Sequence, residues 1–539
     1  MKKPPPPSPK PAENKTILYA CLAVTLLFAA LVRYRLLGLP LERDEGEYAL
    51  MGQLILKGIP PYEMAYSMKL PGTYYLYALF MAVFGQSATG IHLGLLVVNL
   101  ASILLVFFIG KKLLSESSAL FAAASFALLS LSPGVFGFAA HATHFNALFG
   151  LCGLLALLQY ADRPSWLRLA GSGFCFGLAF VMKQQAVFLI LFGLLAFWLI
   201  ERQREPFERT KTAPRFAGLA AAMALPYALV LLTAWFTGTF DEFWHWTVEY
   251  AGQYVGIKTG SDAWRLLNLN FPGVIEGYGL FWLTGLVGLA ALFFPRTSVQ
   301  HRWLILTFAV FSFACVVPGL YFRQHYFIVF LPALALLVGV ALHFLEERLP
   351  QTPWMRLLPL LLFVGMASVA IFRHSTTFFK EDLSKMAART YSPTNPFEAS
   401  LEIARFIRAN SSEQDKIAIL GSEPQICFYS KRLPATGFIY AYPLMENQPY
   451  SLEMQRAMIA EIEKSRPKFL VFVNSPFSWT KSDASAKDIF NWYDQYRSQY
   501  NMVGLVDLNP SGKPTYVWRE ALNGYTPKNK AQVWVYERK

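Results

Sequence analysis

The sequence predicts a polytopic α-helical membrane protein with an α/β domain at its C-terminal end. Of its 539 residues, 54% are hydrophobic and only 15% are charged, whereas soluble proteins average about 25% charged residues. Apolar stretches of roughly 17–25 residues, long enough to cross a bilayer, recur up to about residue 373. Beyond residue 380 the hydrophobic runs shorten and alternate with helical patterns, which is typical of an α/β domain outside the membrane.

We count about eleven transmembrane helices. Residues 1–15 are rich in proline and predict a disordered cytoplasmic tail. The first span, residues 16–37, has no small-residue cleavage site after it, so it is a retained span rather than a signal peptide. The other spans are predicted near residues 90–110, 118–137, 140–160, 167–182, 186–200, 215–236, 273–294, 302–320, 326–345 and 355–373. The predicted organisation is therefore a tail (1–15), a transmembrane domain (16–373) with an outer interfacial loop (41–85), and an extracytoplasmic α/β domain (374–539).

The basic residues orient these spans. Lys2, Lys3 and Lys10 precede the first span, and the clusters found at every second loop fall on the same side. By the positive-inside rule that side is the cytoplasm, so the C-terminal domain faces outward. The clusters are Lys111-Lys112, Arg163 with Arg168, Arg202 to Arg215, Arg296 with Arg302, and Arg348 with Arg356. The net charge of +13 therefore reflects membrane topology and not a nucleic-acid-binding face.

Short elements are predicted in the C-terminal domain, with helices at 396–410, 451–464 and 488–500. Strands are predicted at 416–420, 469–473, 503–508, 516–518 and 533–536. We find no glycine-rich phosphate loop and no catalytic-triad spacing there, so the domain is interpreted as a lid or an acceptor-docking domain. The five cysteines are scattered without C-x-x-C spacing, which argues against disulfides and structural zinc.

The outer loop combines acidic and basic residues close to the membrane. Asp44, Glu45 and Glu47 begin a segment whose apolar residues share one helical face, which predicts a helix lying on the membrane surface. A second interfacial helix is predicted over Pro71–Phe84. The two would wall a cavity with Asp44 at one mouth and Lys69 at the other. Two roles are open for Asp44. It could be the N-cap of this helix, with Glu47 completing a capping box, or it could be a catalytic carboxylate.

Such a cavity suits sugar transfer from a polyprenyl phosphate. The reaction needs a base to deprotonate the acceptor, which a carboxylate can supply. It also needs cations that stabilise the departing phosphate, a role for lysine or arginine. Because the sugar is polar and the donor's tail is a lipid, the site must lie at the membrane interface.

Four motifs, in order along residues 16–345, resemble those of the GT-C glycosyltransferases of family 39. This group includes the protein O-mannosyltransferases and the lipid A aminoarabinose transferase. The first motif resembles its "DE-x-x-YA" signature, and the others its "K-P-P-x-Y-Y", "G-R-R-L" and "R-x-Y-x-x-P-x-L-A-L" segments. The matching residues are Asp44-Glu45-Gly46-Glu47-Tyr48-Ala49, Lys69-Leu70-Pro71 with Tyr74-Tyr75, Gly110-Lys111-Lys112-Leu113, and Arg323-Gln324-His325-Tyr326 before Leu331-Pro332. One departure is Met68, where the aminoarabinose transferases have a glutamate.

The resemblance implies roles for individual residues. Asp44 would be the base, and Glu45 would orient donor or acceptor. The expected ligands of the donor phosphate are Lys69, Lys183, Arg323, His325 and Tyr326. Further substrate contacts are assigned to Glu47, Tyr74, His141 and His144. Lys183 and Arg323 also have a plainer reading as residues anchored at the membrane interface.

No metal site is predicted, because His141 and His144 have no evident third ligand. No cofactor is assigned, and a divalent cation is left open. The predicted function is transfer of a sugar, with inversion, from a polyprenyl-phosphate donor to a lipid, glycan or protein acceptor on the outer face of a bacterial inner membrane. The alternatives are a transporter or flippase for lipid-linked glycans, or a non-catalytic binder of them. A transporter would carry ionisable residues near the membrane midplane, whereas the charges here cluster at span ends.

Overall fold

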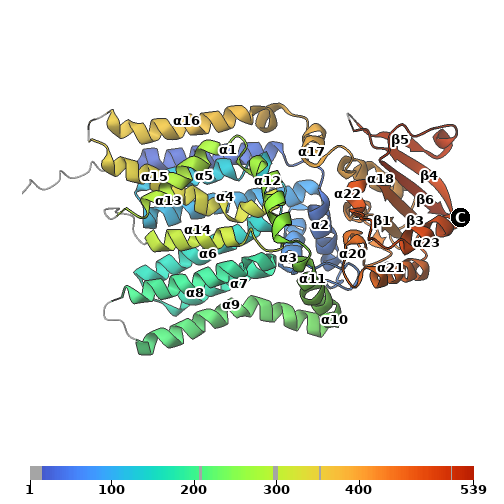
Figure 1. Cartoon of the computed structure of the whole chain (residues 1–539), viewed down its shortest axis with the longest axis horizontal. Helices are drawn as coiled ribbons and strands as arrows, with labels where there is room; N and C mark the ends of the chain where they lie inside the picture. Colours follow the sequence, from blue (N-terminus) through green and yellow to red (C-terminus); the bar gives the residue numbers. More distant parts are fainter. Residues whose placement is uncertain (1–14, 205–208, 295–301, 351, 353, 511–512) are drawn as a thin grey trace, which may run out of the picture.

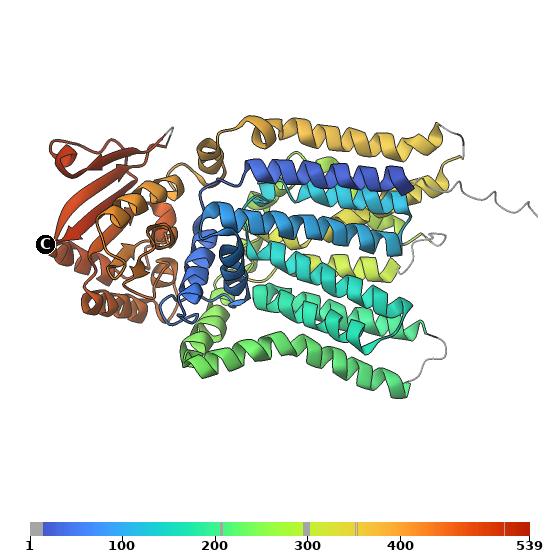
Figure 2. The ribbon, with the colours of Figure 1, turned by 180° about the vertical axis from the view of Figure 1, so that it is seen from behind.

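The computed structural model describes residues 15–204, 209–294, 302–350, 352, 354–510 and 513–539. Most of the predicted tail, and Arg296 of one basic cluster, lie outside these residues. The molecule is elongated, with a helical bundle at one end and a mixed sheet domain at the other (Figure 1). The opposite view shows the same order, with short helices between the bundle and the sheet domain (Figure 2).

Each predicted span corresponds to a helix of the bundle. These helices are α1 (Lys15–Arg35), α4 (Ala88–Leu113), α5 (Glu116–Leu129), α6 (Ala142–Asp162), α7 (Trp166–Met182), α8 (Val187–Arg202), α9 (Arg209–Thr237), α13 (Gly279–Ala291), α14 (Arg302–Ala314), α15 (Leu331–Arg348) and α16 (Leu358–Arg373). Among the described residues, six helices are long and apolar enough to cross a membrane, or seven if the bent pair of α12 (Gly260–Ile275) and α13 is one span. The chain is therefore a multi-pass membrane protein. The count of eleven includes shorter helices such as α5, α7 and α14.

A break in the helical bundle presents functional side chains. Between α14 and α15 the backbone turns through left-handed conformations at Gly319 (φ 77°), Leu320 (φ 58°) and Phe322 (φ 45°). Such values are unfavourable for residues other than glycine. The chain then forms the short helix η4 (Gln324–Val329) before α15 begins. This irregular stretch directs Arg323 and His325 toward the sheet domain end of the bundle.

The layer between bundle and sheet domain contains α2 (Arg43–Leu56), α3 (Gly72–Phe84), α10 (Phe240–Trp244), α11 (Ala251–Gly256) and α12. Helix α2 was predicted as an amphipathic helix on the membrane surface, and in the structure ten of its 14 residues are buried within the protein. Two glycines allow this packing. A Cβ on Gly46 would lie 2.8 Å from Gln425, and one on Gly52 would lie 2.9 Å from the backbone of Ala78 in α3. Helix α2 is thus wedged between α3 and the C-terminal domain.

The C-terminal domain contains one six-stranded sheet in the order β2-β1-β3-β6-β4-β5. Strands β2, β1 and β3 are parallel, and β6, β4 and β5 continue the sheet in antiparallel register. The strands are β1 (Lys416–Leu420), β2 (Leu433–Pro434), β3 (Phe469–Asn474), β4 (Tyr500–Asp507), β5 (Thr515–Trp518) and β6 (Gln532–Arg538). The helices are α17 (Leu383–Tyr391), α18 (Phe397–Ala409), α19 (Gln425–Ser430), α20 (Tyr442–Met445), α21 (Ser451–Ser465), α22 (Pro476–Trp479) and α23 (Asp488–Tyr496). Every predicted helix and strand of this region is confirmed, with β2 and the short helices added.

Candidate active site

The first turn of α2 determines how its acidic side chains point. Glu42 is the N-cap residue, and it forms a reciprocal capping box with Glu45. The predicted capping box of Asp44 with Glu47 is therefore wrong, because the observed box lies two residues earlier in the chain. Because Glu42 already caps the helix, the carboxylate of Asp44 is not required for that role.

The three acids of the first turn differ sharply in accessibility. The side chain of Asp44 is 19% exposed, whereas those of Glu45 and Glu47 are at most 2% exposed. Asp44 lines a cavity of about 250 Å³, here called the central cavity, between the bundle and the C-terminal domain. Of the predicted phosphate ligands, all five line this cavity as well: Lys69, Lys183, Arg323, His325 and Tyr326. Asp44 is therefore the acid of this group that can meet a substrate.

Lys69 is paired with acids instead of standing opposite Asp44. Its Nζ lies 2.9 Å from Oδ1 of Asp44 and 2.5 Å from Oε2 of Glu47. Burial alone would raise the pKa of Asp44, but the charge of Lys69 holds that pKa well below its usual value. The prediction that Asp44 and Lys69 occupy opposite mouths of the cavity is thus wrong.

Glu47 and Tyr74 support Lys69 from behind. Glu47 accepts hydrogen bonds from the hydroxyls of Ser67 (2.6 Å) and Tyr74 (2.7 Å). Both Glu47 and Tyr74 are completely buried, and neither lines the central cavity. Glu47 and Tyr74 were predicted to contact the substrate. We instead assign them the role of holding Lys69 in position.

Two other cations of the cavity have no acidic partner. Among the described residues, neither Lys183 nor Arg323 has a carboxylate oxygen within 4.0 Å. Lys183 Nζ lies 4.0 Å from the ring centre of Tyr326, and Arg323 reaches only the hydroxyl of Tyr254, at 3.5 Å. Burial lowers the pKa of Lys183 to about 7. Both residues are half-buried, and cations withdrawn from water without a counter-ion are costly, so this pair favours binding of an anion.

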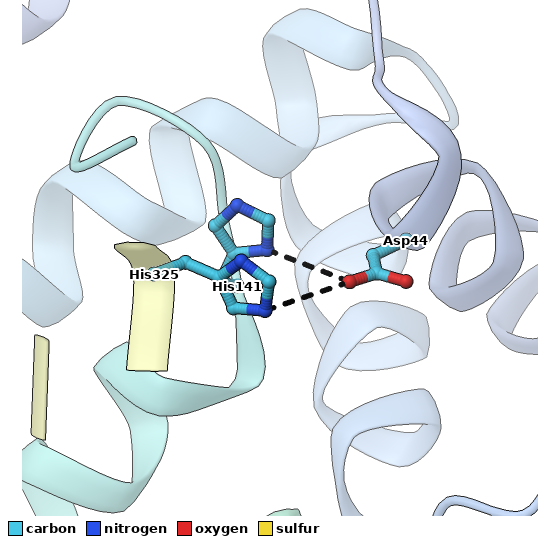
Figure 3. Close-up of side chains that lie close together, drawn as sticks. All are labelled: Asp44, His141 and His325. Atoms are coloured by element: carbon cyan, nitrogen blue, oxygen red, sulfur yellow. Dashed lines mark ion pairs between the residues drawn. The ribbon is translucent and has the colours of Figure 1, made fainter. Parts of the chain in front are cut away.

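Two histidines face the free oxygen of Asp44 (Figure 3). The rings of His141 and His325 stack with centres 4.2 Å apart. His325 Nε2 lies 3.9 Å and His141 Nδ1 lies 4.0 Å from Oδ2 of Asp44. His144, the other predicted histidine, is buried one turn along α6 and does not belong to this group.

These three side chains could hold a metal ion. Their ligand atoms lie within 4.8 Å of one another, and neither ring nitrogen of His141 has a hydrogen-bond partner. Burial lowers the pKa of His141 to about 4, so its ring is neutral at neutral pH. Two imidazoles and a carboxylate suit Zn²⁺ or a similar transition metal. This group could not be predicted from the sequence, because its three residues come from segments that are far apart in the chain.

Glu45 points away from the cavity. Its Oε1 accepts hydrogen bonds from the backbone N–H of Ala140 (2.6 Å), and it lies 3.0 Å from Nε2 of His92. The Ala140 contact fixes the loop that presents His141. Glu45 does not line the central cavity, and its contacts are with the backbone beside His141 and with His92.

The C-terminal domain supplies one wall of the cavity, which sequence analysis missed. Phe438, Tyr440, Tyr442 and Glu446 all line it, and the hydroxyl of Tyr440 lies 3.3 Å from Oδ1 of Asp44. Glu446 accepts a hydrogen bond of 2.5 Å from Tyr250. These residues lie in and around the short helix α20, where the sequence has no recognisable motif.

Solved structures of other proteins share this architecture. ArnT from Cupriavidus metallidurans bound to undecaprenyl phosphate is 16% identical, with a TM-score of 0.61 over 97% of this chain and 98% of that one. AglB from Archaeoglobus fulgidus, in complex with an inhibitory peptide and a dolichol-phosphate, is 12% identical, with a TM-score of 0.52 over 94% and 74%. This chain therefore has the fold of these two proteins.

A third solved structure with this fold is that of the arabinofuranosyltransferase AftD from Mycobacteria. It is 13% identical to this chain, with a TM-score of 0.52 over 98% of this chain and 40% of that one. The sequence profile described as dolichyl-phosphate-mannose-protein mannosyltransferase matches residues 68–248. A comparison with curated protein sequences finds no match. The chain therefore shares the fold of these three proteins, and one segment of it matches the mannosyltransferase profile.

Proposed function

We propose that this protein transfers a sugar from a polyprenyl-phosphate-linked donor to an acceptor at the outer face of the membrane. One observation carries the proposal: two half-buried cations without acidic partners, Lys183 and Arg323, share the central cavity with the carboxylate of Asp44. Cations of this kind stabilise the charge that develops on a departing phosphate. The same cavity also has apolar lining from Val187, Val255 and Pro318, suited to the first part of a lipid chain.

Two proteins of the same fold support this donor class. ArnT was solved with undecaprenyl phosphate and AglB with a dolichol-phosphate. The positive-inside rule supports a cytoplasmic N-terminus and an extracytoplasmic C-terminal domain. With this orientation, the central cavity opens at the outer membrane face, where the lipid and the sugar of such a donor meet water.

The geometry supports an inverting displacement. Oδ1 of Asp44 accepts hydrogen bonds from Lys69 and Tyr440, whereas Oδ2 has no hydrogen-bond partner among the described residues. We assign Oδ2 as the base. As the acceptor oxygen bonds to the anomeric carbon, its proton passes to Oδ2. The bond from that carbon to the phosphate oxygen breaks on the opposite side, and its electron pair leaves with the polyprenyl phosphate, held by Lys183 and Arg323.

A divalent cation has a fitting set of ligands in Asp44, His141 and His325. When bound there, it would supply positive charge beside Asp44 and occupy Oδ2, the oxygen assigned as the base. We therefore propose that turnover uses the metal-free carboxylate, and that a tightly bound transition metal competes with the acceptor's proton.

The test is release of polyprenyl phosphate. The purified protein in lipid nanodiscs is incubated with undecaprenyl-phosphate-linked mannose, glucose, galactose and aminoarabinose, together with an envelope extract as the source of acceptor. We expect undecaprenyl phosphate to accumulate from one of these donors, and Asp44→Asn to abolish it. Absence of release from every donor would contradict an enzymatic role. Movement of an intact donor across the bilayer would instead indicate a flippase.

A further inference from the structure

A second cavity, here called the outer chamber, adjoins the central cavity. It has a volume of about 470 Å³, within the range that accommodates small-molecule ligands. Three residues, Arg323, Tyr442 and Glu446, line both cavities and form the partition between them. The proposed function gives the central cavity to the donor, and the adjoining outer chamber offers space for a second ligand.

A pair of tyrosines connects the outer chamber to Asp44. Tyr442 lines the chamber, and its ring stacks on that of Tyr440 at an interplanar angle of 6°, with centres 5.7 Å apart. The hydroxyl of Tyr440 in turn reaches Asp44. The tyrosine pair therefore links the lining of the chamber to the carboxylate group that holds the assigned base.

The lining of the outer chamber identifies the chemistry of its ligand. It combines the aromatic rings of Tyr321 and Tyr442 with the neutral polar groups of Asn447, Thr480 and Ser482. Sugars expose both hydroxyl groups and C–H faces, and this mixture of rings, amide and hydroxyls complements them. Among the described residues, the side chains of Asn447 and Thr480 form no hydrogen bond within the protein, and both residues are exposed.

The charged side chains of the chamber lining are two cations, Lys258 and Arg323, and one carboxylate, Glu446. Lys258 lies over the ring of Tyr321, with Nζ 5.2 Å from its centre, and Glu446 stands at the partition. Burial raises the pKa of Glu446, and an anionic ligand beside it would raise that pKa further. Because cations and a carboxylate line the chamber together, charge does not separate a neutral carbohydrate from a phosphorylated one, and the aromatic rings and neutral polar groups carry the assignment.

We propose that the outer chamber is the acceptor subsite and that the acceptor is a carbohydrate, whose hydroxyl is delivered past Tyr442 and Tyr440 to Asp44. This inference rests on the proposed function. A polypeptide acceptor fits less well, because the chamber is a compact hollow bounded by the connections around 442–447 and 480–482 and presents no free strand edge.

The first experiment identifies the acceptor class. The donor that supports release of undecaprenyl phosphate is prepared with a tritiated sugar, and the envelope extract is treated before the reaction with either periodate or proteinase K. Periodate cleaves the vicinal diols of sugars, and the protease degrades polypeptides. We expect periodate to abolish incorporation of tritium and proteinase K to leave it intact. Label that survives periodate but disappears after proteinase K would overturn the inference while leaving sugar transfer established.

The second experiment locates the subsite. Asn447→Trp places a large ring in the outer chamber, and Asn491→Trp, on the exposed surface of α23, is the matched control. We expect Asn447→Trp to raise at least tenfold the extract concentration that gives half-maximal transfer, and the control to match wild type. Donor Kd is measured in parallel, as the donor concentration that displaces half of the bound fluorescent undecaprenyl phosphate. Unchanged acceptor dependence, or an equal loss of donor binding, would contradict the assignment of this chamber.

Discussion

The hydroxyl of Tyr440 lies 3.3 Å from Oδ1 of Asp44, although 396 positions separate the two residues in the sequence. The contact joins the C-terminal domain to the first turn of α2, at the carboxylate assigned as the base. It follows that the C-terminal domain takes part in building the site rather than only covering it.

Asp44→Asn should lower the transfer rate by about 10²–10⁴-fold, the usual loss for a general base. Folding should be retained, because Glu42 and not Asp44 caps the helix. The measurement is initial transfer rate together with thermal unfolding in detergent. Glu63→Gln, at an exposed carboxylate of the same outer loop, is the control. Near-normal transfer by Asp44→Asn would remove Asp44 from the chemistry.

Tyr440→Phe removes one hydrogen bond to Asp44 without removing the ring. Loss of a single hydrogen bond of this kind corresponds to a decrease of about three- to tenfold in kcat. The same substitution in the Asp44→Asn background should have little further effect, because the two residues act on one group. Independent, multiplicative losses would show that Tyr440 acts elsewhere.

Lys183→Met should weaken binding of the donor and remove its pH dependence. In the free protein the pKa of Lys183 is near 7, so the ammonium is present below that pH and is lost as the pH rises. Binding of an anionic phosphodiester favours the protonated form, so wild-type donor affinity should fall above about pH 7, by at most tenfold per unit. Donor Kd measured from pH 6 to 9 tests this, with Lys57→Met as control. Identical pH profiles for wild type and Lys183→Met would refute the assignment.

Glu47→Gln should destabilise the fold more than it affects donor binding. Glu47 is fully buried and ion-paired with Lys69, and breaking one side of a buried pair costs about 3–5 kcal/mol. Thermal unfolding should therefore shift downward, whereas Glu63→Gln should leave it unchanged. A variant with wild-type stability would mean that Lys69 keeps its position without Glu47.

Zinc should inhibit turnover by occupying Oδ2 of Asp44. Micromolar Zn²⁺ is expected to lower the transfer rate and EDTA to restore it. His141→Ala removes one ligand and should raise the inhibitory concentration at least tenfold, since a site needs its full set of ligands. If EDTA instead abolishes transfer and added metal restores it, the metal-free mechanism is wrong.

The sequence was sufficient to predict the elements whose signals are local. The hydrophobic periods located the bundle helices, and β1 was predicted with its observed bounds, Lys416–Leu420. The family resemblance named Asp44, Lys183 and Arg323 as candidates, and all three line the central cavity. These successes depend on patterns within a few residues of one another.

The errors concern contacts between distant segments. Burial of α2 depends on Gly46 meeting Gln425, which no local pattern reveals, so its apolar face was assigned to the membrane. Lys69 was expected to be free because its partners Asp44 and Glu47 precede it by more than 20 residues. Tyr440 and Glu446 have no motif at all. Their roles come only from the packing of one domain on the other.

The partition formed by Arg323, Tyr442 and Glu446 also has an evolutionary consequence. Arg323 comes from the bundle, whereas Tyr442 and Glu446 come from the C-terminal domain. Mutations in the connections around 442–447 and 480–482 can therefore alter acceptor preference while Lys183 and Asp44 keep the donor chemistry. Descendants of one ancestral enzyme could diversify the glycans they modify by exchanging these connections, with the lipid carrier held constant.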